Sequence, residues 1–191
     1  RPLASYGATG FVNSPESDFT MPAVRAGLAD SVVAREVVAL GSPPHTSRVE
    51  EIDVVVDIAS SASIRWAAAP LDDRRRLLDS VADTMSRQRM VTLAIMADEA
   101  GKTVREGDPE VGEAIDFGTV GVQQIESLRD DGLSVEPRGV VLVVAPWNFP
   151  YAIPAGGVCA ALAAGNAVIL KPAPQTRRTA WALANQMWDA G

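Results

Sequence analysis

Two polar residues in the last third of the sequence are suited to chemistry. Asn148 lies between Pro146 and Pro150, two prolines that stiffen its loop. Its side-chain amide offers two donors, and a rigidly held donor aimed at a developing oxyanion contributes roughly 3 to 4 kcal/mol in a transition state. The alternative for Asn148 is a turn asparagine that satisfies its own backbone, and spacing alone favours that alternative.

The second candidate is Lys171, a cation at the end of an apolar run. Its ammonium is able to donate hydrogen bonds to ribose hydroxyls or to a phosphate. The alternative is an ordinary surface lysine, which is the usual state of a single lysine.

Two apolar runs must position these residues. Residues 140–145 and 167–170 are short and rich in branched side chains, which is typical of strands buried in a parallel sheet. Between them, residues 153–164 predict a helix of small side chains that ends at Gly165 and Asn166.

The chain continues after the second strand with a predicted helix over 180–190, for which Thr176 is the expected N-cap. The order strand, helix, strand, helix predicts two parallel strands with a right-handed crossover. Ligands bind at the carboxyl ends of such strands. We therefore expect the loops 145–150 and 171–175 to lie side by side and form one site.

Upstream of the strands the sequence is mostly helical. Ser47 and Glu50 have the spacing of a capping box, and a weaker pattern over 22–38 predicts a further helix. Apolar side chains recur at helical spacing in four segments, namely 49–69, 71–89, 90–100 and 109–129. In the last of these, the residues expected to face inward are Val111, Ile115, Val122 and Ile125. The fold class is α/β, a helical layer followed by the first strand–helix–strand–helix of a parallel Rossmann-like sheet.

Composition excludes several classes of function. The formal net charge of −7 argues against a nucleic-acid partner, which would require a basic face. The apolar stretch 151–170 is broken by Pro154 and Asn166 and lacks the bulky residues of a membrane span. A single cysteine, Cys159, excludes a disulfide framework and fits a reducing cytoplasm. His45 has no second histidine or cysteine nearby, so no metal site is expected there.

Two further groups of reactive side chains have plain structural interpretations. Cys159 lies in an alanine-rich helix without a neighbouring base or cation, so we expect a small core residue rather than a nucleophile. Glu110, Glu113 and Asp116 fall near one another on a helix, where a solvated acidic face is expected.

Five segments together resemble the aldehyde dehydrogenase superfamily. They are residues 99–102, 113–117, 146–150, 160–166 and 171–173. The resemblance implies that Asn148 supplies the oxyanion-hole amide and that Phe149 borders the substrate tunnel. It places Glu113 near the substrate. It assigns cofactor binding to Val144, Ala145, Pro146, Trp147, Lys171 and Ala173.

The start of the sequence narrows the resemblance. Residues 10–15, with Asp18, Phe19 and Pro22, are similar to 1-pyrroline-5-carboxylate dehydrogenases, above all the dehydrogenase half of bifunctional proline utilisation A proteins. Those enzymes oxidise glutamate semialdehyde to glutamate in proline catabolism. The implied cofactor is NAD, but Pro174 stands where many members carry a glutamate that favours NAD, so NADP stays open. The implied partners are a small aldehyde and further copies of the full-length enzyme.

The resemblance divides the sequence into an extended N-terminal segment (1–46), the helical part of the cofactor domain (47–133) and a truncated first βαβα unit of the NAD-binding domain (134–191). The family's nucleophilic cysteine and general-base glutamate have no counterpart here, so this stretch by itself is expected to be inactive. Two alternatives stay open, a semialdehyde dehydrogenase of other specificity and a non-catalytic dehydrogenase-like module. A classical dinucleotide-binding dehydrogenase is disfavoured, because no Gly-x-Gly-x-x-Gly follows a strand.

Overall fold

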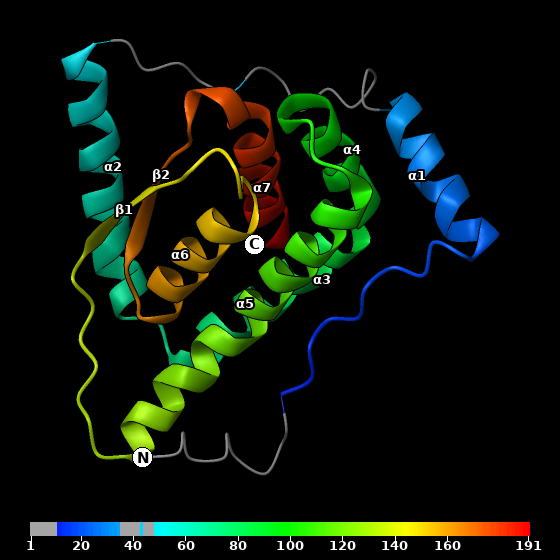
Figure 1. Ribbon diagram of the computed structural model, residues 1–191. Helices are drawn as coiled ribbons and strands as arrows, with labels where there is room; N and C mark the ends of the chain where they lie inside the picture. Colours follow the sequence, from blue (N-terminus) through cyan, green and yellow to red (C-terminus); the bar gives the residue numbers. More distant parts are fainter. Residues whose placement is uncertain (1–10, 35–42, 44–47) are drawn as a thin grey trace.

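The computed structural model describes residues 11–34, 43 and 48–191 (Figure 1). Its helices are α1 (Pro22–Ala34), α2 (Val49–Ala67), α3 (Leu71–Arg87), α4 (Arg89–Ala100), α5 (Val104–Asp130), α6 (Ala152–Ala163) and α7 (Arg177–Ala190), with a 3₁₀ turn η1 (Pro174–Thr176). The strands are β1 (Val140–Val144) and β2 (Ala167–Lys171). This order confirms the predicted helical layer followed by strand, helix, strand, helix.

The two strands run parallel and pair in register from Val140 opposite Ala167 to Val144 opposite Lys171. Figure 1 shows the strand pair between α2 and α6, and both helices contact both strands. The strands are less buried than their composition predicts, since Leu142 and Val144 are exposed. These two side chains project from the same face of β1, because side chains alternate along a strand, and no described element covers them fully.

The small residues of α6 allow close packing on both of its sides. A Cβ at Gly157 would lie 3.0 Å from a methyl group of Val143 on β1. A Cβ at Gly156 would lie 2.9 Å from the ring of Phe117 on α5. The alanine- and glycine-rich sequence of this helix therefore fits it between the strand and α5.

The turn from α6 into β2 also fixes the start of β1. Gly165 adopts a left-handed conformation, with φ of 88°, where a side chain would be strained. The next residue, Asn166, is buried, and its side-chain oxygen accepts hydrogen bonds from the N–H groups of Arg138 at 2.5 Å and Gly139 at 3.0 Å. Asn166 thereby ties the beginning of β1 to the beginning of β2.

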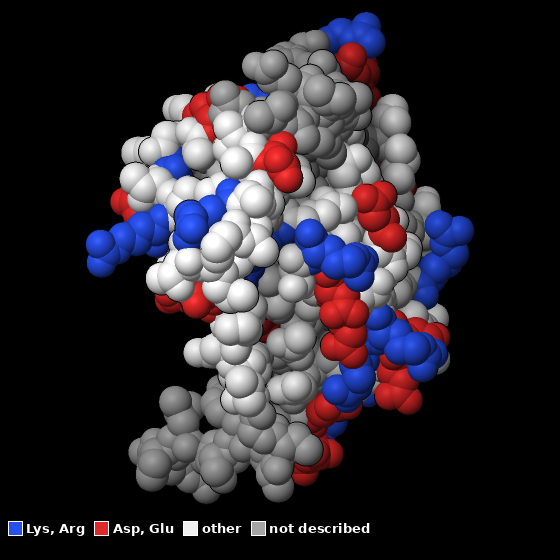
Figure 2. Space-filling view, turned by 90° about the vertical axis from the view of Figure 1, so that its right-hand side faces the viewer, with Lys and Arg blue, Asp and Glu red and all other residues white. Residues whose placement is uncertain are grey.

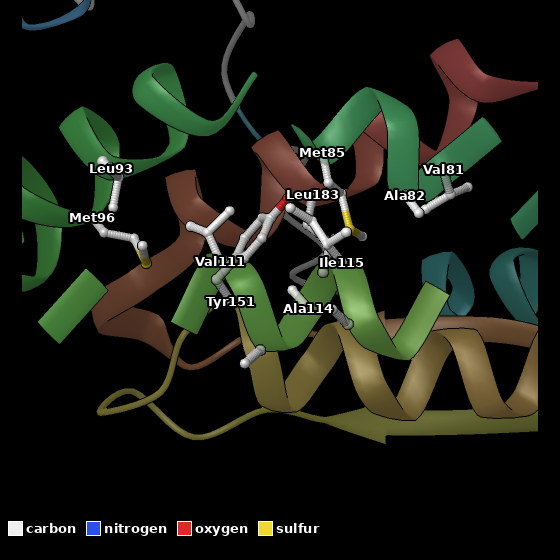
Figure 3. Close-up of a cluster of buried hydrophobic side chains, with 12 residues drawn as sticks. Val81, Ala82, Met85, Leu93, Met96, Val111, Ala114, Ile115, Tyr151 and Leu183 are labelled. Atoms are coloured by element: carbon white, nitrogen blue, oxygen red, sulfur yellow. The ribbon is translucent and has the colours of Figure 1, made fainter. Parts of the chain in front are cut away.

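The main core lies where α3, α4, α5, α6 and α7 meet (Figure 3). The four residues of α5 that the sequence predicted to face inward are all buried: Val111, Ile115, Val122 and Ile125. Tyr151, at the start of α6, directs its ring into the cluster and donates a hydrogen bond from its hydroxyl to Gln186, 2.5 Å away. Burial of the Tyr151 phenol raises its pKa above the ordinary value.

Helices α5 and α7 begin several residues earlier than predicted, and α2 begins at the predicted Val49 but has a different N-cap. Helix α5 begins at Val104 rather than at Pro109, because Thr103 and Glu106 form a capping box and Pro109 lies inside the helix. The N-cap of α2 is Arg48, whose N–H donates to Glu51, whereas Ser47 lies outside the described residues. Helix α7 begins at Arg177 rather than at residue 180.

The surface carries charges of both signs. Figure 2 shows lysine and arginine side chains intermixed with aspartate and glutamate on the face that it presents. Within the described ranges, none of the helices combines the length and the apolar character needed to cross a bilayer.

Candidate functional site

The carboxyl ends of the two strands lie side by side, as the sequence predicted. Val144 pairs with Lys171 at the last position of the ladder, and the N–H of Ala145 donates to the carbonyl oxygen of Lys171 over 3.1 Å. Paired residues of neighbouring strands project to the same face of a sheet, so the exposed side chains of Val144 and Lys171 share one face. The loops that follow the strands therefore begin at one edge.

The loop after β1 presents its central residues to solvent. Ala145 is buried and Pro146 half-buried, whereas Trp147, Asn148 and Phe149 are exposed. Among the described residues, no protein group accepts a hydrogen bond from the Asn148 side-chain amide. The alternative of a turn asparagine bound to its own backbone is therefore absent from the described part of the structure, and both donors of the exposed amide are without a described protein acceptor.

The loop after β2 is shorter than predicted, because Lys171 is the last residue of the strand. Ala173 is buried, and its carbonyl oxygen accepts a hydrogen bond from the N–H of Thr176 over 3.1 Å. Pro174 is exposed at the first position of η1. Within the predicted segment 171–175, the exposed side chains are those of Lys171, Pro174 and Gln175.

A buried pair behind the Asn148 loop was missed by the sequence analysis. Glu110 was expected on a solvated acidic face, but its side chain is 0 % exposed and forms an ion pair with Lys102. Its other carboxylate oxygen accepts hydrogen bonds from the N–H groups of Tyr151 at 2.8 Å and Ala152 at 3.1 Å. The prediction was wrong because Glu110 faces the beginning of α6, which helical spacing alone does not reveal.

Lys102 also contacts the loop itself. Its ammonium donates to the carbonyl oxygen of Asn148 over 3.0 Å and lies 4.1 Å from the centre of the Phe149 ring. Lys102 directly follows Gly101, which ends α4 with φ of 65°. The only sequence signal for this contact was the place of Gly101 and Lys102 in a family-like segment, which gave no contact partner.

A second glutamate closes the start of α7. Thr176 occupies the predicted N-cap position, but its side chain makes no capping hydrogen bond. The carboxylate of Glu99 instead accepts hydrogen bonds from the N–H groups of Arg178 and Thr179, each at 2.7 Å. Glutamates from the helical layer therefore satisfy the first free N–H groups of both α6 and α7.

A groove of 740 Å³ runs between α5, α6 and the N-terminal segment. Glu113 of α5 and Ile153 of α6 are exposed in it, and half-buried Phe117 of α5 also lines it. Among the described residues that line the groove, the charged side chains are all acidic: Glu16, Glu113 and Asp116. Neither Asn148 nor Phe149 lines this groove, so the predicted substrate residues Glu113 and Phe149 lie in different parts of the site region.

The N-terminal segment is fastened to α5 by two carboxylates. The N–H of Ser14 donates to Asp116, and the N–H of Ser17 donates to buried Asp108, each over 2.6 Å. Arg89 pairs with Asp108 at 3.3 Å and donates to the carbonyl oxygen of Pro15 at 2.8 Å. These contacts hold the segment as one wall of the groove.

Cys159 is a core residue, as predicted. Its side chain is fully buried on α6, and burial raises the pKa of the thiol from 9.0 to about 12. A thiol with so high a pKa carries almost no thiolate near neutral pH. Cys159 is therefore unsuited to nucleophilic attack.

Comparisons with known proteins point to one family. The sequence pattern described as "Aldehyde dehydrogenase family" matches residues 38–191. The 1-pyrroline-5-carboxylate dehydrogenase of Geobacillus sp. (strain WCH70) is 35% identical over 154 residues, which are 74% of this chain and 30% of that protein. The bifunctional protein PutA of Salmonella typhimurium is 33% identical over 184 residues, which are 91% of this chain and 14% of that protein.

Solved structures agree with this result. The chain resembles proline utilization A from Bdellovibrio bacteriovorus with a TM-score of 0.86 and 30% identity, over 97% of this chain and 24% of that one. It resembles a Thermus 1-pyrroline-5-carboxylate dehydrogenase with bound NAD with a TM-score of 0.84 and 24% identity, over 95% of this chain and 43% of that one. The second likeness bears on the fold alone.

Proposed function

Because this chain belongs to the aldehyde dehydrogenase family, we propose that it forms the oxyanion-stabilising loop and part of the cofactor cleft of an enzyme that oxidises glutamate semialdehyde to glutamate. The observation that carries the proposal is the exposed amide of Asn148 on a loop that begins beside Lys171. The chain spans 30% or less of the curated relatives described above, so the activity proposed is that of the full-length protein.

The edge formed by the two strand ends fits a nicotinamide cofactor. Lys171 offers an exposed ammonium that can donate to ribose hydroxyls, and Val144 offers an exposed apolar surface on the same face. Ala145, Pro146 and Trp147 would continue this wall, and Ala173 would contribute main chain only, since it is buried. When bound, the cofactor accepts the two electrons removed from the aldehyde carbon.

The start of α6 is closed to the cofactor phosphates. In many dinucleotide-binding folds the pyrophosphate lies at the N-terminus of the helix that follows the first strand. Here the N–H groups of Tyr151 and Ala152 already donate to Glu110, whose carboxylate would repel a phosphate. We therefore assign to this chain the binding of the adenosine ribose at Lys171, and no pyrophosphate site on α6.

Asn148 would act on the aldehyde oxygen. Attack by a nucleophile on the carbonyl carbon turns that oxygen into an oxyanion, and a preorganised N–H donor stabilises the negative charge as it develops. The amide of Asn148 is free to donate because no described protein group uses it. Buried Cys159 is not the nucleophile, so we assign the attacking thiolate and the water-activating base to residues outside these 191.

The acidic groove supports an amino-aldehyde substrate. Glutamate semialdehyde carries an ammonium group, which the carboxylates of Glu113 and Glu16 can attract. A carboxylate anchor requires a cation or N–H donors, and the described lining of this groove holds no lysine or arginine. We therefore assign Glu113 to the substrate ammonium, and assign the substrate carboxylate to another part of the full-length enzyme.

The proposal is tested with the purified full-length protein. Formation of reduced nicotinamide is followed with 1-pyrroline-5-carboxylate, succinate semialdehyde and an uncharged short aldehyde, each with NAD and with NADP. We expect kcat/KM to be highest for 1-pyrroline-5-carboxylate. A higher kcat/KM for succinate semialdehyde would refute the substrate, and the absence of turnover with all three would favour a non-catalytic module.

A further inference from the structure

We propose that Lys102 and Glu110 are positioning residues for the aldehyde oxidation, because together they fix the backbone on which the Asn148 amide is held. This inference rests on the proposed function of Asn148. It assigns neither residue a direct contact with substrate or cofactor.

Glu110 holds the chain directly after the loop. One carboxylate oxygen accepts the N–H groups of Tyr151 at 2.8 Å and Ala152 at 3.1 Å, and the other accepts the ammonium of Lys102. The first N–H groups of a helix have no partner within the helix and carry partial positive charge, so a carboxylate is the partner that suits them best. Since Glu110 comes from α5, it ties the end of the loop to the helical layer.

Lys102 holds the loop at its centre. Its ammonium lies 3.0 Å from the carbonyl oxygen of Asn148 and 4.1 Å from the centre of the Phe149 ring. A cation at this distance over an aromatic face is attracted by the ring electrons. The side chain of Lys102 is only 12% exposed, so these contacts replace most of its hydration.

The direction of the Asn148 amide depends on these contacts. The side chain makes no hydrogen bond to any described protein group, so its own backbone determines where it points. Three hydrogen bonds fix that backbone. The N–H of Ala145 donates to Lys171 of β2, the carbonyl oxygen of Asn148 accepts from Lys102, and the N–H of Tyr151 donates to Glu110. A misplacement of about 1 Å at a reacting group can lower a rate on the order of 100-fold, so loss of one fixed point is expected to reduce kcat.

A merely structural role makes a different prediction. If the pair only stabilises the packing of α4, α5 and α6, its loss would lower the melting temperature while each folded molecule kept its kcat. Glu99 provides the matched control, because it accepts two N–H groups at the start of α7 and its described hydrogen bonds do not involve the Asn148 loop. Glu99→Gln therefore reports the effect of weakening a comparable cap elsewhere.

The experiment compares Glu110→Gln, Lys102→Met, Lys102→Arg and Glu99→Gln in the full-length enzyme. Active-site titration gives kcat per folded site, and thermal unfolding gives Tm. For Glu110→Gln and Lys102→Met we expect kcat to fall about 10-fold or more, with the aldehyde KM changed by less than about 3-fold, since the loss affects the transition state. Lys102→Arg, which keeps the charge, is expected to retain more of the kcat than Lys102→Met.

Glu99→Gln is expected to lower Tm and leave kcat within about 2-fold, as for a structural cap. The inference is overturned if Glu110→Gln and Lys102→Met behave like Glu99→Gln. Should Glu110→Gln fail to fold, Lys102→Met decides, because it leaves the cap of α6 in place.

Hydrogen exchange separates this inference from the proposed function. In wild type, the hydrogen-bonded amides of Ala145, Tyr151 and Ala152 are expected to exchange slowly, and faster in Lys102→Met than in Glu99→Gln. If the wild-type enzyme oxidises no aldehyde, the proposed function fails, while this measurement still shows whether the pair holds the loop. Equal exchange in the two variants would refute the holding role even in an active enzyme.

Discussion

The N–H of Ala145 donates to the carbonyl oxygen of Lys171 over 3.1 Å, one residue beyond the pairing of Val144 with Lys171. This hydrogen bond extends the contact between β1 and β2 into the first residue of the loop that carries Asn148. Asn148 and Lys171 therefore start from one edge of the sheet, although 22 intervening residues separate them in the sequence.

Replacement of Asn148 by alanine in the full-length enzyme should lower kcat on the order of 10²- to 10³-fold, because one oxyanion donor is lost. The side chain is exposed and makes no hydrogen bond to a described protein group, so Tm should change little. Steady-state kinetics and thermal unfolding check both points. A loss of kcat below about 3-fold would remove Asn148 from the mechanism.

Replacement of Lys171 by methionine should weaken cofactor binding. The exposed ammonium is the hydrogen-bond donor proposed for the ribose, and a charge-assisted hydrogen bond contributes about 1.5 to 3 kcal/mol. We expect the cofactor Kd to rise about 10-fold or more, with a smaller change in the aldehyde KM, because each 1.4 kcal/mol is a factor of ten. Fluorescence titration with NAD measures this, and an unchanged Kd would assign Lys171 to the solvated surface.

Replacement of Pro174 by glutamate should shift cofactor preference toward NAD. A carboxylate near the ribose would accept hydrogen bonds from its hydroxyls and would repel the extra phosphate of NADP. Pro174 is exposed at the start of η1, so the larger side chain has room. The measurement is the ratio of kcat/KM for NAD and NADP in both proteins. If that ratio stays constant, Pro174 does not face the adenosine ribose.

Cys159 should resist alkylation in the folded protein and react once it is unfolded, because burial raises its pKa to about 12. A raised folded pKa means that the thiol's contribution to stability is complete below the unfolded value of 9.0 and is lost as pH rises toward about 12. The difference in unfolding free energy between wild type and Cys159→Ala should therefore shrink over this interval.

Cys159→Ala should also retain the wild-type kcat. Its free energy of unfolding should be lower by about 1 kcal/mol, because the side chain is smaller. Mass spectrometry measures the alkylation of Cys159, denaturant unfolding measures the unfolding free energy, and steady-state kinetics measure kcat. Rapid labelling of the native enzyme with loss of activity would contradict the core assignment.

The sequence by itself determined the order of the helices and strands and the sheet edge at which the candidate site lies. Short apolar runs and a helix of small residues predicted parallel strands, because these patterns depend on local spacing and on the handedness of the crossover. These patterns therefore predict that the loops of Asn148 and Lys171 are neighbours. The buried state of Cys159 followed in the same way from its alanine-rich surroundings.

Only the tertiary structure decided which charged residues support the loop. Glu110 looked like part of a solvated acidic face, because helical spacing says which residues share a face and not what that face meets. Its partners are Lys102, eight residues earlier, and the N–H groups at the start of α6, about 40 residues later. Such contacts arise when separate elements pack together and bury polar groups that must then be paired, so they leave no periodic signal in the sequence.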